Sequence, residues 1–150
     1  MSAASTSEPG ADLTNSTPEE RAEFFRKHQE RTAATTPNRV LVAGSRSWQS
    51  LDKIRMRLLR LPATATIIHG GAPGADRAAG WLAEDFGFQV EEHPADWERH
   101  GKRAGFLRNV EMLDSGVDLV LAFWDGESRG TKHTIDEARK RGIPVEVVTP

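Results

Sequence analysis

Short runs of apolar residues alternate along this chain with longer stretches in which apolar residues recur every three or four positions. The apolar runs are typical of buried β-strands, and five occur at residues 40–43, 65–69, 88–92, 117–123 and 143–148. Between the strands, the spacing predicts helices with one apolar face at residues 51–61, 78–86, 104–113 and 131–141. The chain therefore alternates between strand and helix from residue 39 onward.

Nearly continuous apolar strands separated by amphipathic helices are typical of a parallel sheet that is covered on both faces. We therefore predict an α/β protein with a Rossmann-like three-layer fold, in which a mostly parallel five-stranded sheet carries helices on both faces. The predicted domain spans residues 39–150.

Residues 1–38 are rich in Ser, Thr, Ala, Pro and Glu and almost lack branched aliphatic residues. Such a segment buries too little apolar surface to order itself, so we predict a flexible N-terminal arm. Inside the arm, Thr17-Pro18-Glu19-Glu20 is a capping box with proline in the first turn. This motif predicts a short helix near residues 18–31.

The composition and charge limit the classes of protein to which this chain can belong. The chain has 150 residues, 37% of them hydrophobic and 28% charged, with a net charge of −2, which suits one domain. It has no cysteine, which excludes disulfides and thiol nucleophiles and fits a cytoplasmic setting. The histidines lack ligand spacing, so we predict no metal and no cofactor. No apolar run approaches the roughly 20 residues that span a membrane.

The unusual residues of the chain follow the ends of the predicted strands. Ligands of open parallel sheets bind beyond the carboxyl ends of the strands. Four strands run into segments rich in glycine, hydroxyl, arginine and tryptophan residues: 44–46, 69–76, 94–108 and 124–131. The connections at the opposite edge contain little beyond turn residues. The pattern therefore predicts a ligand site at one edge of the sheet.

The second strand ends in the glycine-rich segment His69-Gly70-Gly71-Ala72-Pro73-Gly74-Ala75-Asp76, and a helix begins at once. Glycine permits positive φ and close approach of a ligand, and the first N–H groups of a helix lack partners within it. The segment predicts a phosphate-binding loop, and a plain turn with Asp76 as N-cap is the alternative. A second phosphate cradle is predicted at Gly130 and Thr131.

Several side chains at this edge have two interpretations. Arg46 is placed to bind a phosphate with two N–H groups, aided by the Ser45 hydroxyl, or is a surface cation. Arg108 is predicted to point into the crevice. Asp76 caps its helix, accepts from a ligand hydroxyl or orients Arg46, whereas His69 is interpreted chiefly as a structural histidine. The predicted ligand-binding residues are Gly44, Ser45, Arg46, His69, Gly70, Gly71, Ala72, Gly74, Ala75, Asp76, Trp97, Arg108, Asn109, Trp124, Asp125, Gly130 and Thr131.

These motifs in order resemble the YspA-like branch of the SLOG superfamily over residues 39–150. The resemblance rests on Gly44-Ser45-Arg46, the segment 69–76, Gly101-Lys102-x-Ala104-Gly105-x-x-Arg108-Asn109-x-x-Met112, and Gly130-Thr131 after Ala122-Phe123. It implies a Rossmann-like domain that binds a nucleotide or a nucleotide-derived small molecule. It also suggests a homodimer or a larger homo-oligomer.

The superfamily includes the lonely-guy phosphoribohydrolases, which cleave the N-glycosidic bond of nucleoside monophosphates. Residues 108–112 are similar to their arginine-bearing helix motif, which makes Arg108 a candidate catalytic residue. Those enzymes carry a glutamate three residues after the Gly-Thr pair, and that position is Thr134 here. Asp125, Glu127 or Glu111 would have to supply the missing carboxylate. Glycosidic hydrolysis is therefore an alternative to simple binding.

A second relative implied by the resemblance is the bacterial DNA-processing family, whose Rossmann domain binds single-stranded DNA. Such binding needs a cationic groove with aromatic platforms. Arginines and lysines of the predicted edge alternate with Asp76, Asp96, Asp125 and Glu127, and mixed charge suits a small polar ligand better than a polyanion. We therefore expect a module that senses or sequesters a nucleotide-like ligand, with Trp97 or Trp124 stacking on a base and DNA as an unlikely partner.

Overall fold

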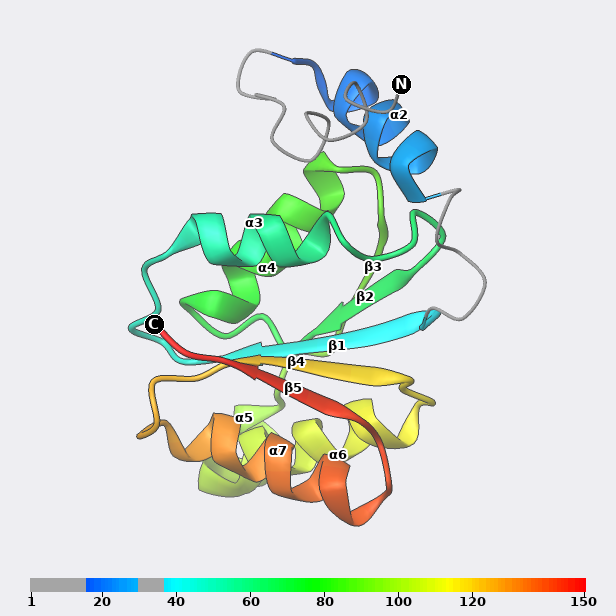
Figure 1. The fold of residues 1–150 in the computed structure, drawn as a ribbon. Helices are drawn as coiled ribbons and strands as arrows, with labels where there is room; N and C mark the ends of the chain where they lie inside the picture. The colour runs from blue at the N-terminus through cyan, green and yellow to red at the C-terminus, as the bar shows by residue number, and fades with distance from the viewer. Residues whose placement is uncertain (1–15, 30–36) are drawn as a thin grey trace.

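The sheet is the centre of the computed structural model, which describes residues 16–29 and 37–150. In that part of the chain, five strands form one sheet in the spatial order β3-β2-β1-β4-β5, and every neighbouring pair is parallel (Figure 1). The strands are β1 (Arg39–Gly44), β2 (Thr66–His69), β3 (Gln89–Glu92), β4 (Leu119–Phe123) and β5 (Val145–Val148). The predicted Rossmann-like α/β fold is confirmed, with an all-parallel rather than a mostly parallel sheet.

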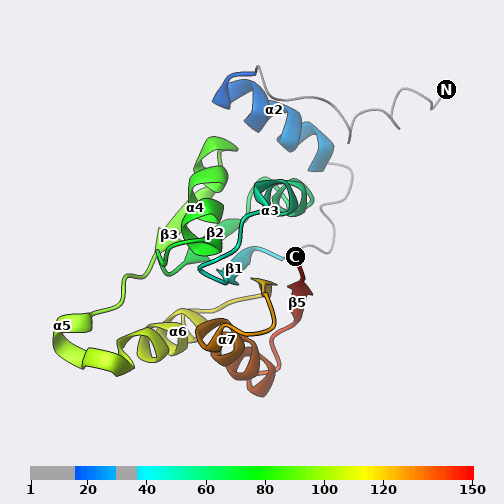
Figure 2. The ribbon, with the colours of Figure 1, turned by 90° about the vertical axis from the view of Figure 1, so that its left-hand side faces the viewer.

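Helices cover both faces of the sheet (Figures 1 and 2). One face carries α3 (Leu51–Leu58) and α4 (Ala75–Asp85), and the other carries α6 (Ala104–Asp114) and α7 (Arg129–Lys140). A short helix, α5 (Trp97–His100), and a 3₁₀ turn, η3 (Gly101–Arg103), lead into α6. The strand order changes direction between β1 and β4, which is where open α/β sheets form their ligand crevice.

Successive side chains of the strands point to opposite faces of the sheet, so the hydrophobic core consists of two clusters. Val40 and Val42 of β1 pack in the cluster under α3 and α4, whereas Leu41 between them packs in the cluster under α6 and α7. All three side chains are fully buried. Because successive side chains of a strand point to opposite faces, a strand covered on both faces has to be apolar throughout. This is why the strands are visible in the sequence as continuous apolar runs.

Some boundaries differ from the prediction. Helix α4 begins at Ala75, three residues before the predicted start, because the positive φ of 88° at Gly74 ends the loop there. The segment before α6, expected as a long loop, contains α5, whose first turn is capped by the Asp96 carboxylate accepting from the Arg99 N–H. Strand β4 begins at Leu119 rather than at residue 117.

A helix of the N-terminal arm, α2 (Pro18–Gln29), lies against α4. Its capping box is formed, since the Thr17 N–H donates to the Glu20 carboxylate and the Glu20 N–H donates to the Thr17 hydroxyl. Arg21 pairs with Asp85 near the end of α4, at an N–O distance of 2.5 Å. The flexibility expected for the rest of the arm concerns residues 1–15 and 30–36, which lie outside the described residues.

Candidate functional site

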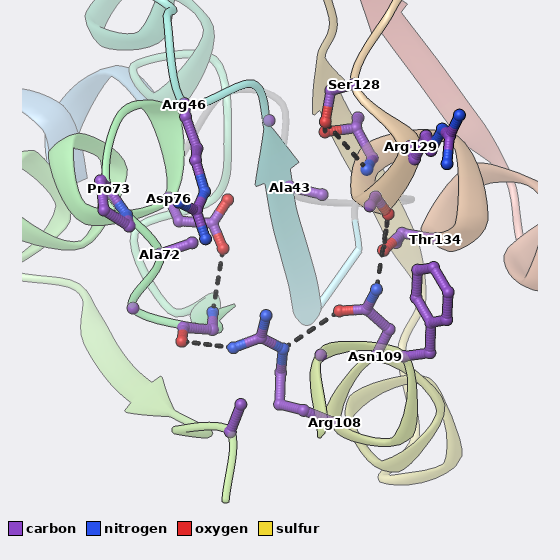
Figure 3. A pocket seen from close by; sticks show the side chains of 18 of the residues that line it. Ala43, Arg46, Ala72, Pro73, Asp76, Arg108, Asn109, Ser128, Arg129 and Thr134 are labelled. Atoms are coloured by element: carbon purple, nitrogen blue, oxygen red, sulfur yellow. Dashed lines mark hydrogen bonds between the residues drawn. The ribbon is translucent and has the colours of Figure 1, made fainter. Parts of the chain in front are cut away.

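A cavity of about 730 Å³ opens at the carboxyl ends of the strands, beside β1 and β4 (Figure 3). Its walls come from the loops after β1, β2, β3 and β4 and from helix α6. The predicted residues that line it are Gly44, Arg46, Gly70, Gly71, Ala72, Asp76, Trp97, Arg108, Asn109, Asp125, Gly130 and Thr131. Parallel strands bring their carboxyl ends to one edge, so segments far apart in the sequence meet here.

The first glycine loop, residues 69–76, packs closely against the carboxyl end of β1. Gly74 has a φ of 88°, and a Cβ on it would lie 2.5 Å from the Ser45 carbonyl oxygen. A Cβ on Gly44 would collide with the Ala75 side chain and with the Phe123 carbonyl oxygen. The absence of these two side chains lets α4 begin directly against β1. Gly74 therefore shapes the loop, although it does not itself line the cavity.

The carboxylate of Asp76 folds back into this loop from the second residue of α4. The Gly70 N–H donates to it at 3.3 Å, and the nearby N–H groups of Gly44 and Ala72 also favour its ionised form. Burial raises the pKa of the Asp76 carboxyl to about 6, against the opposing effects of Arg108 and these N–H groups. The Asp76 carboxylate thus lies inside the loop that was expected to bind phosphate, and phosphate binding by this loop stays a prediction.

Arg108 and Asn109 connect the two glycine loops across the floor of the cavity. The Arg108 guanidinium donates from Nη1 to the Gly70 carbonyl oxygen at 2.6 Å and from Nε to the Asn109 side-chain oxygen at 3.1 Å (Figure 3). Asn109 in turn donates to the Gly130 carbonyl oxygen at 3.4 Å. Burial lowers the pKa of Arg108, while nearby Asp76 raises it. Arg108 points into the cavity, as the sequence predicted.

The second glycine loop starts α7 and has a different pattern of donors. The Ser128 hydroxyl caps the helix by accepting from the Thr131 N–H, and the Asp125 carboxylate accepts from the N–H groups of Glu127 and Ser128. These two donors lower the pKa of Asp125. Within the described residues, no acceptor faces the N–H groups of Arg129 and Gly130. A helix start of this kind attracts an anion.

Arg46 lies at the mouth of the cavity on the exposed loop after β1. Its side chain extends toward Asp76 in Figure 3, and no hydrogen bond or ion pair joins its guanidinium to any described residue. An arginine without a partner retains all its donors for a ligand. Glu92 also lines the cavity, with its carboxylate packed over the positive-φ residue Gly71.

Thr134 stands where the resemblance to the phosphoribohydrolases expects a glutamate. It is buried, lines the cavity, and donates its hydroxyl to the Gly130 carbonyl oxygen at 3.3 Å. Of the candidate substitutes, Asp125 and Glu127 line the cavity, whereas Glu111 does not and lies 3.8 Å from His93 instead. The Asp125 carboxylate accepts hydrogen bonds from the backbone of its own loop, so it has a structural role there.

Four other predicted residues lie outside the cavity lining. Ser45 is fully buried, and its hydroxyl accepts from the Asp125 N–H at 3.1 Å, so it joins two loops rather than facing a ligand. His69 accepts the Gly71 N–H on Nδ1 at 3.0 Å, and burial lowers its pKa, which fits the structural interpretation. Ala75 is buried, and Trp124 donates its indole N–H to the Ser128 carbonyl oxygen.

Two aromatic side chains line the cavity near α6. Trp97 is 54% exposed and packs over Gly105, where an added Cβ would meet its ring at 3.5 Å. Phe106 was not predicted; it is 45% exposed and its ring stacks on His133 at 4.4 Å between centroids. An aromatic residue off the apolar face of its helix is the sequence signal that would have revealed Phe106. Both rings offer a flat apolar surface to a planar ligand group.

The parallel sheet and the cavity at its switch point define a Rossmann-like α/β domain. A model of YAcAr, the YspA, cpYpsA-related SLOG family, matches residues 38–100. The Gene 61 protein of Mycobacterium phage D29 is 48% identical over 116 residues, which are 71% of this chain and 93% of that protein. The chain belongs to the YspA, cpYpsA-related SLOG family.

A solved structure with the same fold is DNA processing protein A of Streptococcus pneumoniae. The TM-score is 0.59 at 20% sequence identity, and the match covers 73% of this chain and 50% of that one. The chain therefore spans half the length of this structural neighbour, and the likeness concerns the fold.

Two features are absent from the described residues, 16–29 and 37–150. No helix there is long and apolar enough to cross a membrane. No group of three or more His, Asp or Glu side chains there is arranged to hold a metal ion. The homodimer suggested by the resemblance stays a prediction.

Proposed function

We propose that this protein binds a nucleotide or a nucleotide-derived small molecule in the cavity and acts as a sensor or sequestering module for it. Membership of the SLOG family supports a nucleotide-type ligand. The observation that carries the proposal is the meeting of three features in one cavity: the open N-terminus of α7, the unpartnered guanidinium of Arg46, and the guanidinium of Arg108.

A phosphate of the ligand would bind the N–H groups of Arg129 and Gly130 at the start of α7. Arg46 and Arg108 would supply positive charge from the opposite wall. The rings of Trp97 and Phe106 would receive a base, since both are exposed within the cavity lining. Each part of a nucleotide thus has a chemically matched surface.

Binding without cleavage is the better-supported activity. Hydrolysis of an N-glycosidic bond needs a carboxylate beside the developing ribosyl cation, and Thr134 offers only a hydroxyl that is already bonded to Gly130. The carboxylate of Asp125 is held by backbone donors of its own loop. Neither of these two groups is free to act on the sugar, so hydrolysis would depend on the Glu127 carboxylate, which also lines the cavity.

The first test is mass spectrometry of small molecules released by denaturing the purified full chain. Thermal unfolding with a panel of nucleoside monophosphates follows, since a ligand at 100 times its Kd adds about 2.7 kcal/mol. Arg60→Ala is the matched control for Arg46→Ala, because both arginines are exposed and Arg60 lies outside the cavity lining.

The outcomes separate the candidate functions. Nucleotide recovered intact, with binding lost in Arg46→Ala and kept in Arg60→Ala, supports the proposal. Free base and ribose phosphate after incubation would establish a hydrolase instead. Binding of single-stranded DNA that falls steeply with salt would overturn the small-ligand proposal and favour a nucleic-acid function.

A further inference from the structure

The two helix N-termini at the cavity differ in whether their anion-binding groups are free. At α4, the Ala75 N–H donates to the Ser45 carbonyl oxygen, and the Gly70 N–H of the loop before the helix donates to the Asp76 carboxylate. At α7, the N–H groups of Arg129 and Gly130 have no acceptor within the described residues. The glycine segments were both predicted as phosphate cradles, yet only one of them is open.

The Asp76 side chain is a buried part of the cavity wall. The residue is 6% exposed, lines the cavity, and lies near the guanidinium of Arg108. An ionised carboxylate has about four acceptor positions, and the Gly70 N–H fills one of them. Acceptor positions are therefore left for a donor that enters from the cavity.

We propose that the ionised carboxylate of Asp76 in the first glycine loop selects ligands that have one anionic end and one hydroxyl-bearing end. The anionic end binds at α7, and a sugar hydroxyl donates to Asp76. This inference rests on the proposed nucleotide binding and specifies the ligand class within it. A phosphate in place of that hydroxyl meets a buried like charge and is rejected.

The proposal distinguishes a mononucleotide from an internal nucleotide of DNA. In a nucleic-acid strand, each sugar carries phosphates on both its 5′ and 3′ oxygens, so a chain crossing both loops brings one phosphate to α7 and the next to Asp76. The second phosphate would meet the Asp76 carboxylate there, and the Gly70 N–H already donates to that carboxylate. Arg108 lies near Asp76 and offsets part of this repulsion.

The experiment is calorimetric titration of the full chain with three probes of the best-bound base. These probes are the nucleoside 5′-monophosphate, its 2′,3′-dideoxy form and its 3′,5′-bisphosphate. We expect wild type to bind the dideoxy form and the bisphosphate each at least roughly tenfold more weakly than the monophosphate, since a hydrogen bond to a charged group contributes that much.

Asp76→Asn keeps the size of the side chain and removes its charge, so the penalty against the bisphosphate is expected to fall to less than roughly threefold. Asp118→Asn is the matched control, because the Asp118 carboxylate also accepts two backbone N–H groups, those of Asn38 and Arg39, but outside the cavity lining. This control is expected to keep the wild-type ratios. Thermal unfolding shows whether each variant is folded.

If Asp76→Asn does not fold, the ratios of the wild-type affinities for the three probes alone test the role of Asp76. Equal affinity of wild type for the monophosphate and the bisphosphate overturns the role of Asp76 while nucleotide binding stands. An unchanged ratio in a folded Asp76→Asn protein does the same. Failure of wild type to bind any of the monophosphates overturns the proposed function, and this inference with it.

Discussion

The buried carboxyl of Asp76 is expected to make the stability of this protein depend on pH. Burial raises its pKa from 3.8 to about 6. The folded protein then binds the proton more tightly than the unfolded chain does. The free energy of unfolding therefore falls as pH rises from about 4 through 6, and the loss is complete above about pH 7.

The size of this effect follows from the shift in pKa. A difference of roughly two units, at 1.36 kcal/mol for each unit, corresponds to about 3 kcal/mol. In Asp76→Asn this titration is absent, while the other titrating groups are shared with wild type. The free energy of unfolding of wild type minus that of the variant should therefore decrease by up to about 3 kcal/mol between pH 4 and pH 7.5.

Urea denaturation of both proteins across this range measures the difference. A difference that stays constant with pH would show that Asp76 keeps an ordinary pKa. A difference that increases with pH would show that Arg108 and the three N–H groups outweigh desolvation, and the physical argument would be wrong.

Three further variants test other parts of the structure. Arg46→Ala should abolish nucleotide-dependent stabilisation in thermal unfolding and change the stability of the free protein by less than about 0.5 kcal/mol, because the side chain is exposed; wild-type affinity would remove Arg46 from the site. Gly71→Val should abolish nucleotide binding and lower the free energy of unfolding by roughly 1–3 kcal/mol without unfolding the domain, because φ is 74° and the Glu92 carboxylate occupies the space of an added side chain. Calorimetry measures the binding and urea denaturation the stability, and wild-type behaviour in both would contradict the prediction. Asp85→Ala removes the partner of Arg21, so limited proteolysis should cut residues 16–29 faster than in wild type; equal rates would mean that this ion pair does not hold α2.

The fold was predictable because both faces of the sheet are covered. Each strand has to be apolar on both sides, and Val40, Leu41 and Val42 show this as an unbroken run. Helix α5 was not predictable in the same way, since four residues are too few for a helical period. Its formation depends on one local contact, the Asp96 cap.

The edge of the sheet that holds the cavity was also predictable, because the carboxyl ends of parallel strands lie together. The direction of individual side chains was harder to infer. Ser45 and Arg46 are neighbours in a loop, yet Ser45 turns inward to Asp125 while Arg46 is exposed at the cavity. Phe106 was missed because the apolar residues of its helix already had the spacing of one apolar face, and Phe106 lies outside that face.

The two glycine loops illustrate why a motif does not determine its chemistry. Both follow a strand, both contain glycine, and both begin a helix whose first N–H groups lack helical partners. At α4 the Ala75 N–H donates to the Ser45 carbonyl oxygen, and the Asp76 carboxylate accepts from Gly70 in the loop before the helix. At α7 the Asp125 carboxylate also accepts from residues before the helix begins, and no described residue accepts from the N–H groups of Arg129 and Gly130. Whether the donors at a helix start are filled thus depends on which oxygen atoms the preceding loops bring against them. The order of residues alone did not reveal this difference, because it depends on where each carboxylate folds. A second phosphate of a ligand at the first glycine loop would have to compete with the Asp76 carboxylate for the Gly70 N–H in a buried setting, where like charges repel most strongly.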